Sequence, residues 1–342
     1  MATLGLGTSM TLAEIVRRKD PKGNIADIVN VLNETNEIVQ DVKWEECNNG
    51  TYHEATRLAT KPTGALRAYN MGVASEVSVT EKITEPTSMR AGMSKVDETL
   101  LRHTGNPALV RAQEDAFYME GMVEQFVRDM FDGNRATSPL SINGINNRAD
   151  YNVQSSEHVF DNAKGNASAT ANKSSIYIVQ WGDKMVNALY PRGDAAGGSM
   201  PVKSTDYGVD LVNDDATATR QYPAYRTWLE LHYGLFIYDP RCIKRLSNIS
   251  TTNIDGVDDF MFDEELAMEA IAQLEYGRRN AVMYCNKDVL VQIQWRANQK
   301  TNAFFTQDKE AGDGSFAKPV YRFNGVPIRI VDAITSTQAK IS

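Results

Sequence analysis

The most constraining feature of this sequence is one long helical pattern between Asn106 and Asn134. Asn106 is a good N-cap, Pro107 stands at the first helical position, and Gly133 with Asn134 has the chemistry of a helix end. The pattern predicts a helix over Pro107–Asp132 that is about 39 Å long, well above the average in globular proteins. Its expected buried stripe consists of Leu109, Ala112, Ala116, Met119, Val123, Phe126 and Met130.

The composition of this stripe indicates how the helix packs. Two of its seven positions are alanine, which argues against a coiled-coil seam, because such seams rely on large apolar side chains. We therefore expect one face of the helix to pack on a sheet of its own subunit, so that the helix acts as a beam. Its length also argues against a compact catalytic domain.

The segment that precedes this helix, residues 48–93, is poor in large aliphatic side chains. Thr51–Leu58 and Glu76–Ile83 alternate as strands do. One interpretation is a long surface hairpin on an ordinary domain. However, an isolated two-stranded ribbon is marginal in water, and a long segment without its own core is unusual in a compact domain. The sequence therefore favours a ribbon that lies on another subunit.

The N-terminal region contains two short amphipathic patterns. Thr11 and Glu14 form a capping box, which predicts a helix from Leu12 to about Lys19. No neighbouring segment in the sequence can fully cover the apolar faces of these patterns, so we expect an arm that docks elsewhere. The apolar face of the second pattern consists of Ile25, Ile28, Val29 and Leu32.

The stretch after the long helix alternates between polar loops and one clear strand. Residues 134–174 are rich in Asn, Ser, Ala and Gly, which predicts loops. Ser175–Trp181 is expected to be a strand, followed by a short helical or turn segment to Leu189. Val202–Arg220 is polar and is expected to be exposed.

Turn chemistry predicts two hairpins in the C-terminal half of the chain. The first has its turn at Gly234, between strand-like runs at 225–233 and 235–238. The second has Asn-Gly at 324–325, a strong signal for a tight turn between short strands. Pro327 follows and indicates an edge or bulged position in the last strand.

A small α/β unit is expected between these two turns. Asp263 caps a predicted helix that ends at Gly277, and Ala281–Cys285 has the apolar character of a strand. Asn286 then caps another helix. The order helix, strand, helix is typical of a small α/β domain.

Composition limits the classes of function. The formal net charge is −8, which argues against a protein that grips nucleic acid through a broad basic face. Three widely spaced cysteines, Cys47, Cys242 and Cys285, make a disulfide framework or a zinc ribbon improbable. The chain lacks a signal-peptide pattern and any apolar run long enough to span a membrane. We expect a soluble protein that is made in the cytosol.

No set of residues indicates a catalytic, cofactor-binding or metal site, and we predict none. The histidines lie far apart without an HExxH pattern, and each is expected to be a surface or packing residue. Cys285 is expected to be buried and inert. The acidic run from Asp255 to Glu265 could bind a cation, but a solvated helix start is favoured. The four histidines are His53, His103, His158 and His232.

Five segments carry a resemblance to a known family. They are Thr11–Thr56, Glu114–Met122, Ser174–Gly193, Tyr233–Ile249 and Phe323–Ile334. These segments are similar to major capsid proteins of epsilon-fifteen-like short-tailed phages, which have the Hong Kong 97-type fold. The resemblance follows the order of the chain almost throughout, with no clear match in the polar stretches 134–174 and 202–222.

The resemblance implies an α+β fold and a division of the chain. It implies an N-terminal arm at 1–47, an extended β-loop at 48–95 and a peripheral domain at 96–174 that contains the spine helix 107–132. It further implies a mainly axial α/β domain at 175–318, and a closing β-hairpin with the C-terminus at 319–342.

The function implied by the resemblance is that of a shell subunit and not of an enzyme. Copies of the chain would form the hexamers and pentamers of an icosahedral head that encloses double-stranded DNA without sequence-specific binding. Further partners would be a portal protein and decoration or scaffolding proteins, with no membrane and no cofactor. The protein would reside in the virion after assembly in the host bacterial cytoplasm.

Two alternatives to a phage capsid remain open at this point. An encapsulin-type compartment would share the fold and load an enzyme as cargo. A cytosolic α/β enzyme of unknown chemistry would stay a monomer or a small oligomer.

Overall fold

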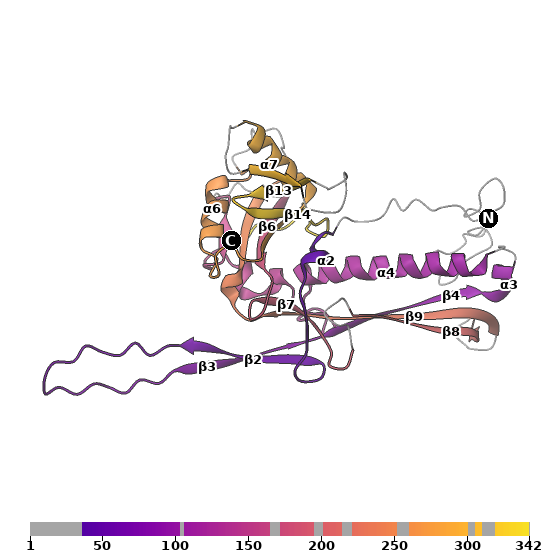
Figure 1. Ribbon diagram of the computed structural model, residues 1–342, viewed down its shortest axis with the longest axis horizontal. Helices are drawn as coiled ribbons and strands as arrows, with labels where there is room; N and C mark the ends of the chain where they lie inside the picture. Colours follow the sequence, from indigo (N-terminus) through magenta and orange to yellow (C-terminus); the bar gives the residue numbers. More distant parts are fainter. Residues whose placement is uncertain are drawn as a thin grey trace.

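The computed structural model has a globular body with two long extensions that point in opposite directions (Figure 1). One extension is a helix that lies along a long sheet, and the other is a two-stranded ribbon. The two helices expected between residues 12 and 32 lie outside the described residues. The structure describes residues 36–102, 106–164, 172–194, 201–213, 221–251, 260–299, 305–309 and 319–341.

The body is built on a seven-stranded sheet with the order β12-β13-β14-β11-β6-β10-β5. β6 (Lys173–Gln180) and β11 (Ala281–Cys285) are buried along their whole length, which is typical of strands covered on both faces. The strand predicted at Ser175–Trp181 and the one at Ala281–Cys285 are thus confirmed. The other strands are β5 (Val159–Asp161), β10 (Ile243–Ser250), β12 (Phe305–Lys309), β13 (Pro319–Phe323) and β14 (Val326–Ile330).

Two capped helices contribute to the core of this body. α6 (Glu264–Ala272) begins where Asp263 Oδ1 accepts a hydrogen bond from the Glu265 N–H at 2.9 Å. α7 (Lys287–Gln299) begins at Asn286, whose Oδ1 accepts from the Val289 N–H at 3.0 Å. Both caps are as the sequence predicts. The shared apolar core includes Ile176, Ile178, Leu246, Phe262, Ile271, Met283, Val289 and Phe323.

The long sheet is organised around β9 (Gln221–Ile237). β9 pairs in antiparallel fashion with β4 (Ser88–Asp97) on one side and β8 (Val202–Asn213) on the other. Its C-terminal end pairs with β7 (Val186–Tyr190), which in turn pairs in parallel with β1 (Trp44–Glu46). β8 is mostly exposed, as predicted for its sequence, but it is a strand, with a shift in its pairing register between Asp206 and Gly208.

The hairpin predicted at Gly234 is wrong, because β9 continues through this residue without a turn. The glycine lies at a tightly packed position instead. A Cβ atom here would lie 3.1 Å from the Leu189 Cβ and 3.3 Å from the Pro86 carbonyl oxygen. Glycine therefore allows two other segments to approach β9 closely.

The long helix α4 spans Pro107–Asp132, as predicted, and lies along β4 and β9 (Figure 1). At its N-terminus, the Asn106 side chain accepts a hydrogen bond from the Leu109 N–H at 3.3 Å. A polar cluster fixes the helix on the sheet. Asp129 of α4 accepts a hydrogen bond from the Arg90 guanidinium of β4 at 2.7 Å and another from the Tyr233 hydroxyl of β9.

The buried stripe predicted for α4 is only half correct. Phe126 and Met130 are fully buried as expected. In the N-terminal half, Leu109 and Met119 are 41% and 38% exposed, and both predicted alanines are exposed too. Successive helical residues are rotated by about 100° around the helix axis. The N-terminal half of α4 therefore rests on the sheet with the face next to the predicted stripe. The buried apolar residues of α4 are Val110, Met122, Phe126, Val127, Met130 and Phe131.

Three further expectations are corrected by the structure. The turn expected after Trp181 is present at residues 182–185, but it does not continue to Leu189, because Val186–Tyr190 is the buried strand β7. Pro327 does not lie in an edge strand, because β14 is flanked by β13 and β11. The pairing of β14 with β11 begins at Ile328, one residue after Pro327. The missing N–H of Pro327 therefore removes no hydrogen bond between these two strands. Residues 134–174 contain short elements as well as loops.

The remaining elements are short. The predicted Asn-Gly turn is confirmed, with φ of 50° at Asn324 and 83° at Gly325.

Among the described residues, no helix is long and apolar enough to cross a membrane. The short elements are α2 (Ile38–Asp41), α3 (Glu98–Arg102), η1 (Ile145–Asn147), α5 (Ala149–Asn152) and η2 (Pro240–Cys242). The ribbon consists of the longer strands β2 (Tyr52–Thr60) and β3 (Val79–Pro86).

Candidate functional site

The ribbon formed by β2 and β3 is the most unusual surface of the molecule. Its strands pair from Tyr52 opposite Pro86 to Thr60 opposite Val79, and residues 61–78 extend beyond them (Figure 1). The ribbon thus occupies the middle of the range 48–95, because the following residues turn away and enter the long sheet as β4. The strands predicted near 51–58 and 76–83 are confirmed.

The outer part of the ribbon is apolar and uncovered. Leu66 and Tyr69 are as exposed as in an extended chain, at 106% and 100%, and Val77 is 78% exposed. Large apolar side chains gathered on one exposed segment are typical of protein–protein interaction sites. Further exposed apolar residues of the ribbon are Leu58, Met71, Val73 and Val79.

Polar contacts along the ribbon are local and solvent-exposed. Arg57 pairs with Glu81 at 3.0 Å, and Lys82 pairs with Glu54 at 2.6 Å across the strands. The hydrogen bond from Lys82 lowers the pKa of the Glu54 carboxyl. Exposed pairs of this kind add little stability, so these contacts alone do not hold the ribbon rigid.

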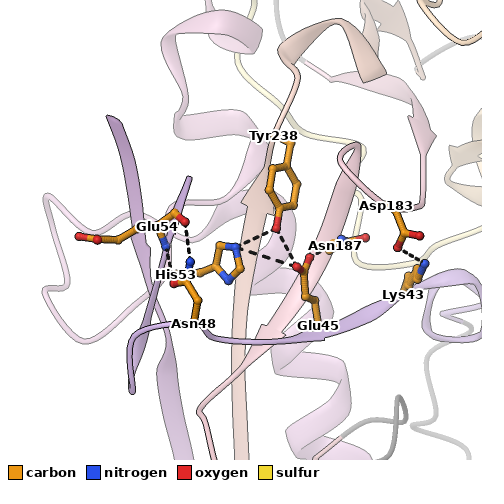
Figure 2. A network of polar contacts seen from close by, with 8 residues as sticks. All are labelled: Lys43, Glu45, Asn48, His53, Glu54, Asp183, Asn187 and Tyr238. Atoms are coloured by element: carbon orange, nitrogen blue, oxygen red, sulfur yellow. Dashed lines mark hydrogen bonds and ion pairs between the residues drawn. The ribbon is translucent and has the colours of Figure 1, made fainter. Parts of the chain in front are cut away.

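The base of the ribbon is anchored by a partly buried polar network, which Figure 2 shows. The Tyr238 hydroxyl lies 2.8 Å from both Glu45 Oε1 and His53 Nε2. Because a hydroxyl has one hydrogen, donation to Glu45 leaves its oxygen free to accept from the His53 Nε2–H. Asn187 donates to the other Glu45 oxygen at 2.6 Å. Burial and this carboxylate raise the pKa of Tyr238.

The same anchor contains an apolar cluster and a backbone clamp. The His53 ring packs edge-on against Phe236, with 4.7 Å between the ring centroids. Asn48 binds both the N–H and the carbonyl of Glu54, at 2.9 and 2.7 Å, so the loop before β2 is fixed to the strand. The apolar side chains around this base are Cys47, Ala55, Ile83, Leu189, Phe236 and Tyr238.

A buried ion pair holds the other strand of the ribbon. Glu85 of β3 lies 2.6 Å from Arg148, and their side chains are only 11% and 15% exposed. Arg148 also donates to the carbonyl oxygens of Asn143 and Leu235, at 3.1 Å each. The ribbon therefore leaves the body from a base that is fixed on both strands.

The histidines and cysteines of the described part of the chain are packing residues. His158 lies beside the buried Lys244. Burial, and to a smaller extent the positive charge of Lys244, lower the pKa of the His158 imidazole. His232 lies near two carboxylates on the long sheet. Burial raises the pKa of Cys47, Cys242 and Cys285 to about 12, so these thiols stay protonated. His103 lies outside the described residues.

Sequence reasoning named no site residue, and the structure shows which residues it missed. Glu45, Glu85 and Arg148 converge on the ribbon base from segments far apart in the chain. Nothing in their local sequence marks them, and Glu85 lies just beyond the strand predicted at Glu76–Ile83. Within the described ranges, no group of three or more His, Cys, Asp or Glu side chains could hold a metal ion.

A family model described as major capsid protein GP7 matches residues 20–342. The chain belongs to this family of major capsid proteins. It is thus a subunit of the head shell of a phage, and its place is the capsid of the virion. This membership favours the phage capsid over the encapsulin-type and enzyme alternatives.

Solved structures agree with the family. The capsid structure of bacteriophage epsilon15 matches 100% of this chain and 99% of its own, with 27% identity and a TM-score of 0.73. The fold is therefore the α+β fold of Hong Kong 97-type capsids. Two further matches are more distant. The bacteriophage JBD30 capsid has 9% identity and a TM-score of 0.45, and the match covers 90% of this chain and 93% of that one. An encapsulin complex from Synechococcus elongatus has 11% identity and a TM-score of 0.43, and the match covers 67% of this chain and 94% of that one. No curated protein matches the sequence.

Proposed function

We propose that the chain builds the hexamers and pentamers of an icosahedral head around double-stranded DNA, and that its ribbon joins neighbouring subunits. The observation that carries this proposal is the uncovered apolar segment 61–78 on a ribbon whose base is fixed. A segment that is exposed in one subunit but apolar needs a second copy to bury it. The extended loop 48–95 would then overlap the neighbour.

The geometry suits a shell held together by many weak contacts. A fixed base presents the outer ribbon in one direction, so little orientational freedom is lost when it docks. Closure of a shell multiplies each contact through avidity, so no single contact must be strong. The arm 1–47, the peripheral unit 96–174, the axial unit 175–318 and the closing segment 319–342 would complete the subunit.

Charge balance supports enclosure of DNA without tight binding. The chain has 36 Lys and Arg residues against 44 Asp and Glu. A subunit with a net negative charge has no surplus of cations to hold phosphates, and sequence-independent DNA affinity requires such a surplus. We infer no enzymatic activity, catalytic residue or cofactor.

Other partners follow from the same role. A head that is filled with DNA needs an entry channel, so a portal protein would replace one pentamer. Decoration or scaffolding proteins would bind the outer or inner surface. Assembly would take place in the cytoplasm of the bacterial host.

The decisive experiment replaces residues 62–77 by a two-residue Asn-Gly turn in the overexpressed full chain. This change removes the outer ribbon but keeps Ile83 and Glu85, which belong to the fixed base. We expect a folded, soluble subunit by circular dichroism that forms no closed shells in electron micrographs. Normal shells would show that the ribbon does not join subunits.

A point substitution refines this test. Tyr69→Asp places a charge on the exposed outer ribbon, whereas Leu140→Asp makes the same kind of change at a residue that is 86% exposed outside the ribbon. We expect Tyr69→Asp to reduce the yield of shells strongly and Leu140→Asp to leave it near the wild-type level. Equal losses would mean that the ribbon has no special role.

A further inference from the structure

Lys244 is buried without an acidic partner in the part of the chain that the structure describes. It lies near the start of β10, and only 3% of the residue is exposed. Its Nζ atom donates hydrogen bonds to the Glu157 carbonyl oxygen at 3.2 Å and to His158 Nδ1 at 3.1 Å. No described carboxylate forms an ion pair with it. Lysines are almost never this buried unless they are paired with an acid, so the arrangement needs an explanation.

The charged groups around Lys244 do not replace such a partner. Asp239 and Glu275 both pair with Arg241 instead, at 2.7 and 2.9 Å. Burial is the largest influence on Lys244 and lowers its pKa, and the charge of Arg241 acts in the same direction. The carboxylates of Glu157, Asp239 and Glu275 act against both, to a smaller extent than burial. The ammonium form is therefore less favoured here than in a lysine surrounded by water.

The neighbouring imidazole limits the protons that this contact can hold. An ammonium group has only donors, so His158 Nδ1 must be unprotonated when it accepts a hydrogen bond from Lys244. Burial and the charge of Lys244 lower the pKa of the imidazole. The carboxylates that oppose this shift are those of Asp150, Glu157 and Asp239. The amine thus lies against a neutral ring and not against a negative charge.

A pocket of about 510 Å³ gives access to this lysine. It lies beside β5, the last strand of the seven-stranded sheet, and Val159 and Phe160 of that strand line it together with Lys244. Its volume is in the range of pockets that take small molecules. A small reagent can therefore reach an amine that is shielded from larger ones.

An amine in such a place has the properties of a nucleophile. Only a neutral amine has the free electron pair that attacks a carbonyl carbon. Lysines become nucleophilic where burial or a neighbouring cation lowers their pKa. Lys244 has both influences, and His158 Nδ1 is placed to receive the proton that the ammonium group must lose.

We propose that Lys244 is a modification site, whose amine condenses with a small uncharged aldehyde that enters this pocket. The Nζ electron pair forms a bond to the carbonyl carbon, and the carbonyl π electrons move to the oxygen, which takes up a proton. This oxygen then leaves as water, and a C=N bond replaces the C=O bond without an oxidant or a reductant. The reaction consumes the amine, so it does not make the subunit an enzyme.

Reductive alkylation of the unassembled full chain tests the site. Propanal condenses with a neutral amine, cyanoborohydride reduces the imine to a stable secondary amine, and peptide mass spectrometry locates the product. Lys203 of β8 is an exposed lysine in the same chain and serves as the control. At about pH 7 we expect Lys244 to react about tenfold faster than Lys203, because a larger fraction of it is neutral. The advantage should disappear near about pH 11, where both amines are neutral. Equal rates at neutral pH would overturn the proposal.

Two substitutions at His158 separate the effect of charge from that of size. His158→Glu supplies a carboxylate next to the amine, which should hold Lys244 protonated and reduce its rate to that of Lys203 or below. His158→Gln has the same size without the charge, and it should keep most of the difference between the two lysines. Equal rates of Lys244 in the two variants would also overturn the proposal. If either variant fails to fold by circular dichroism, the pH profile of the wild-type chain decides the question.

An aldehyde attached to a large polymer tests the role of the pocket. The polymer should modify the exposed Lys203 and leave Lys244 unmodified, because only a small molecule fits the pocket. Modification of both lysines by the polymer would show that Lys244 reacts as an ordinary surface amine, which would contradict the proposal. None of these readouts requires a closed shell, so a failure here is separate from a failure of the ribbon.

Discussion

The Arg148 guanidinium lies 2.6 Å from the Glu85 carboxylate and fixes one strand of the ribbon to the body of the subunit. Both side chains are largely shielded from water, and Arg148 uses its remaining donors on backbone carbonyls. The pair thus links a surface extension to the loop that follows the long helix.

Removing one partner of this pair should destabilise the subunit. Arg148→Ala leaves a shielded carboxylate and two carbonyls without donors, so we expect the free energy of unfolding to fall by about 3 kcal/mol. Urea denaturation of the unassembled subunit measures it. Arg57→Ala removes an exposed ribbon pair and should cost less than about 1 kcal/mol. A comparable loss in both variants would contradict the role assigned to burial.

The two halves of α4 should respond differently to the same substitution. Phe126→Asp places a charge in the centre of the core, where Phe126 contacts Trp44 and Tyr233, and it should prevent folding. Met119→Asp changes an exposed position and should leave a folded subunit. Circular dichroism and solubility distinguish the outcomes. Loss of folding in both would mean that the stripe is part of the subunit core.

Alanine substitutions at Gly234 and Gly121 form a matched pair that tests the packing at Gly234. Gly234→Ala introduces a Cβ only 3.1 Å from Leu189 and should cost about 1–3 kcal/mol through overpacking. Gly121→Ala lies inside α4 with open space around the new atom, and it should stabilise the helix by up to about 1 kcal/mol. Thermal unfolding measures both shifts, and a Gly234→Ala variant as stable as wild type would contradict the packing role.

Alkaline pH should destabilise the subunit through its thiols. The pKa of each cysteine rises from 9.0 to about 12 in the folded chain, so the native state keeps protons that the unfolded state loses. The contribution of the thiols to the free energy of unfolding should stay constant below about pH 9. It should then decrease as the pH rises from this value to about 12.

Denaturation at pH 8 and 10.5 measures this slope. A variant with all three cysteines changed to alanine should show a smaller decrease, because only groups such as Tyr233 then remain, with a pKa raised to about 12. An identical decrease in both proteins would exclude the thiols as the cause. A thiol reagent should react with none of the native cysteines before unfolding.

Local signals predicted the starts of the capped helices well, although α6 ends at Ala272 and not at the predicted Gly277. The bounds of α4 follow from Asn106, Pro107 and Gly133, and the caps of α6 and α7 follow from Asp263 and Asn286, because each cap acts within a few residues. The Asn-Gly turn is equally local. Such features need no knowledge of the rest of the chain.

Features that depend on distant contacts could not be predicted. Gly234 resembles a turn residue, yet its role is set by Leu189 and Pro86, which approach it from other strands. The buried face of α4 changes where the helix passes from the long sheet to the core. The anchor of the ribbon joins Glu45 to Tyr238, 193 residues apart, and no spacing rule connects them.

The continuity of β9 has a mechanical consequence. Seventeen residues of uninterrupted strand, roughly 56 Å at 3.3 Å per residue, run from the far end of the long sheet to the foot of the ribbon. At that foot, Gly234 has no side chain, and a Cβ atom there would lie 3.3 Å from the Pro86 carbonyl oxygen, so the two backbones lie close together. Because β9 is continuous, a tilt of the far end of the long sheet should move the base of the ribbon with it.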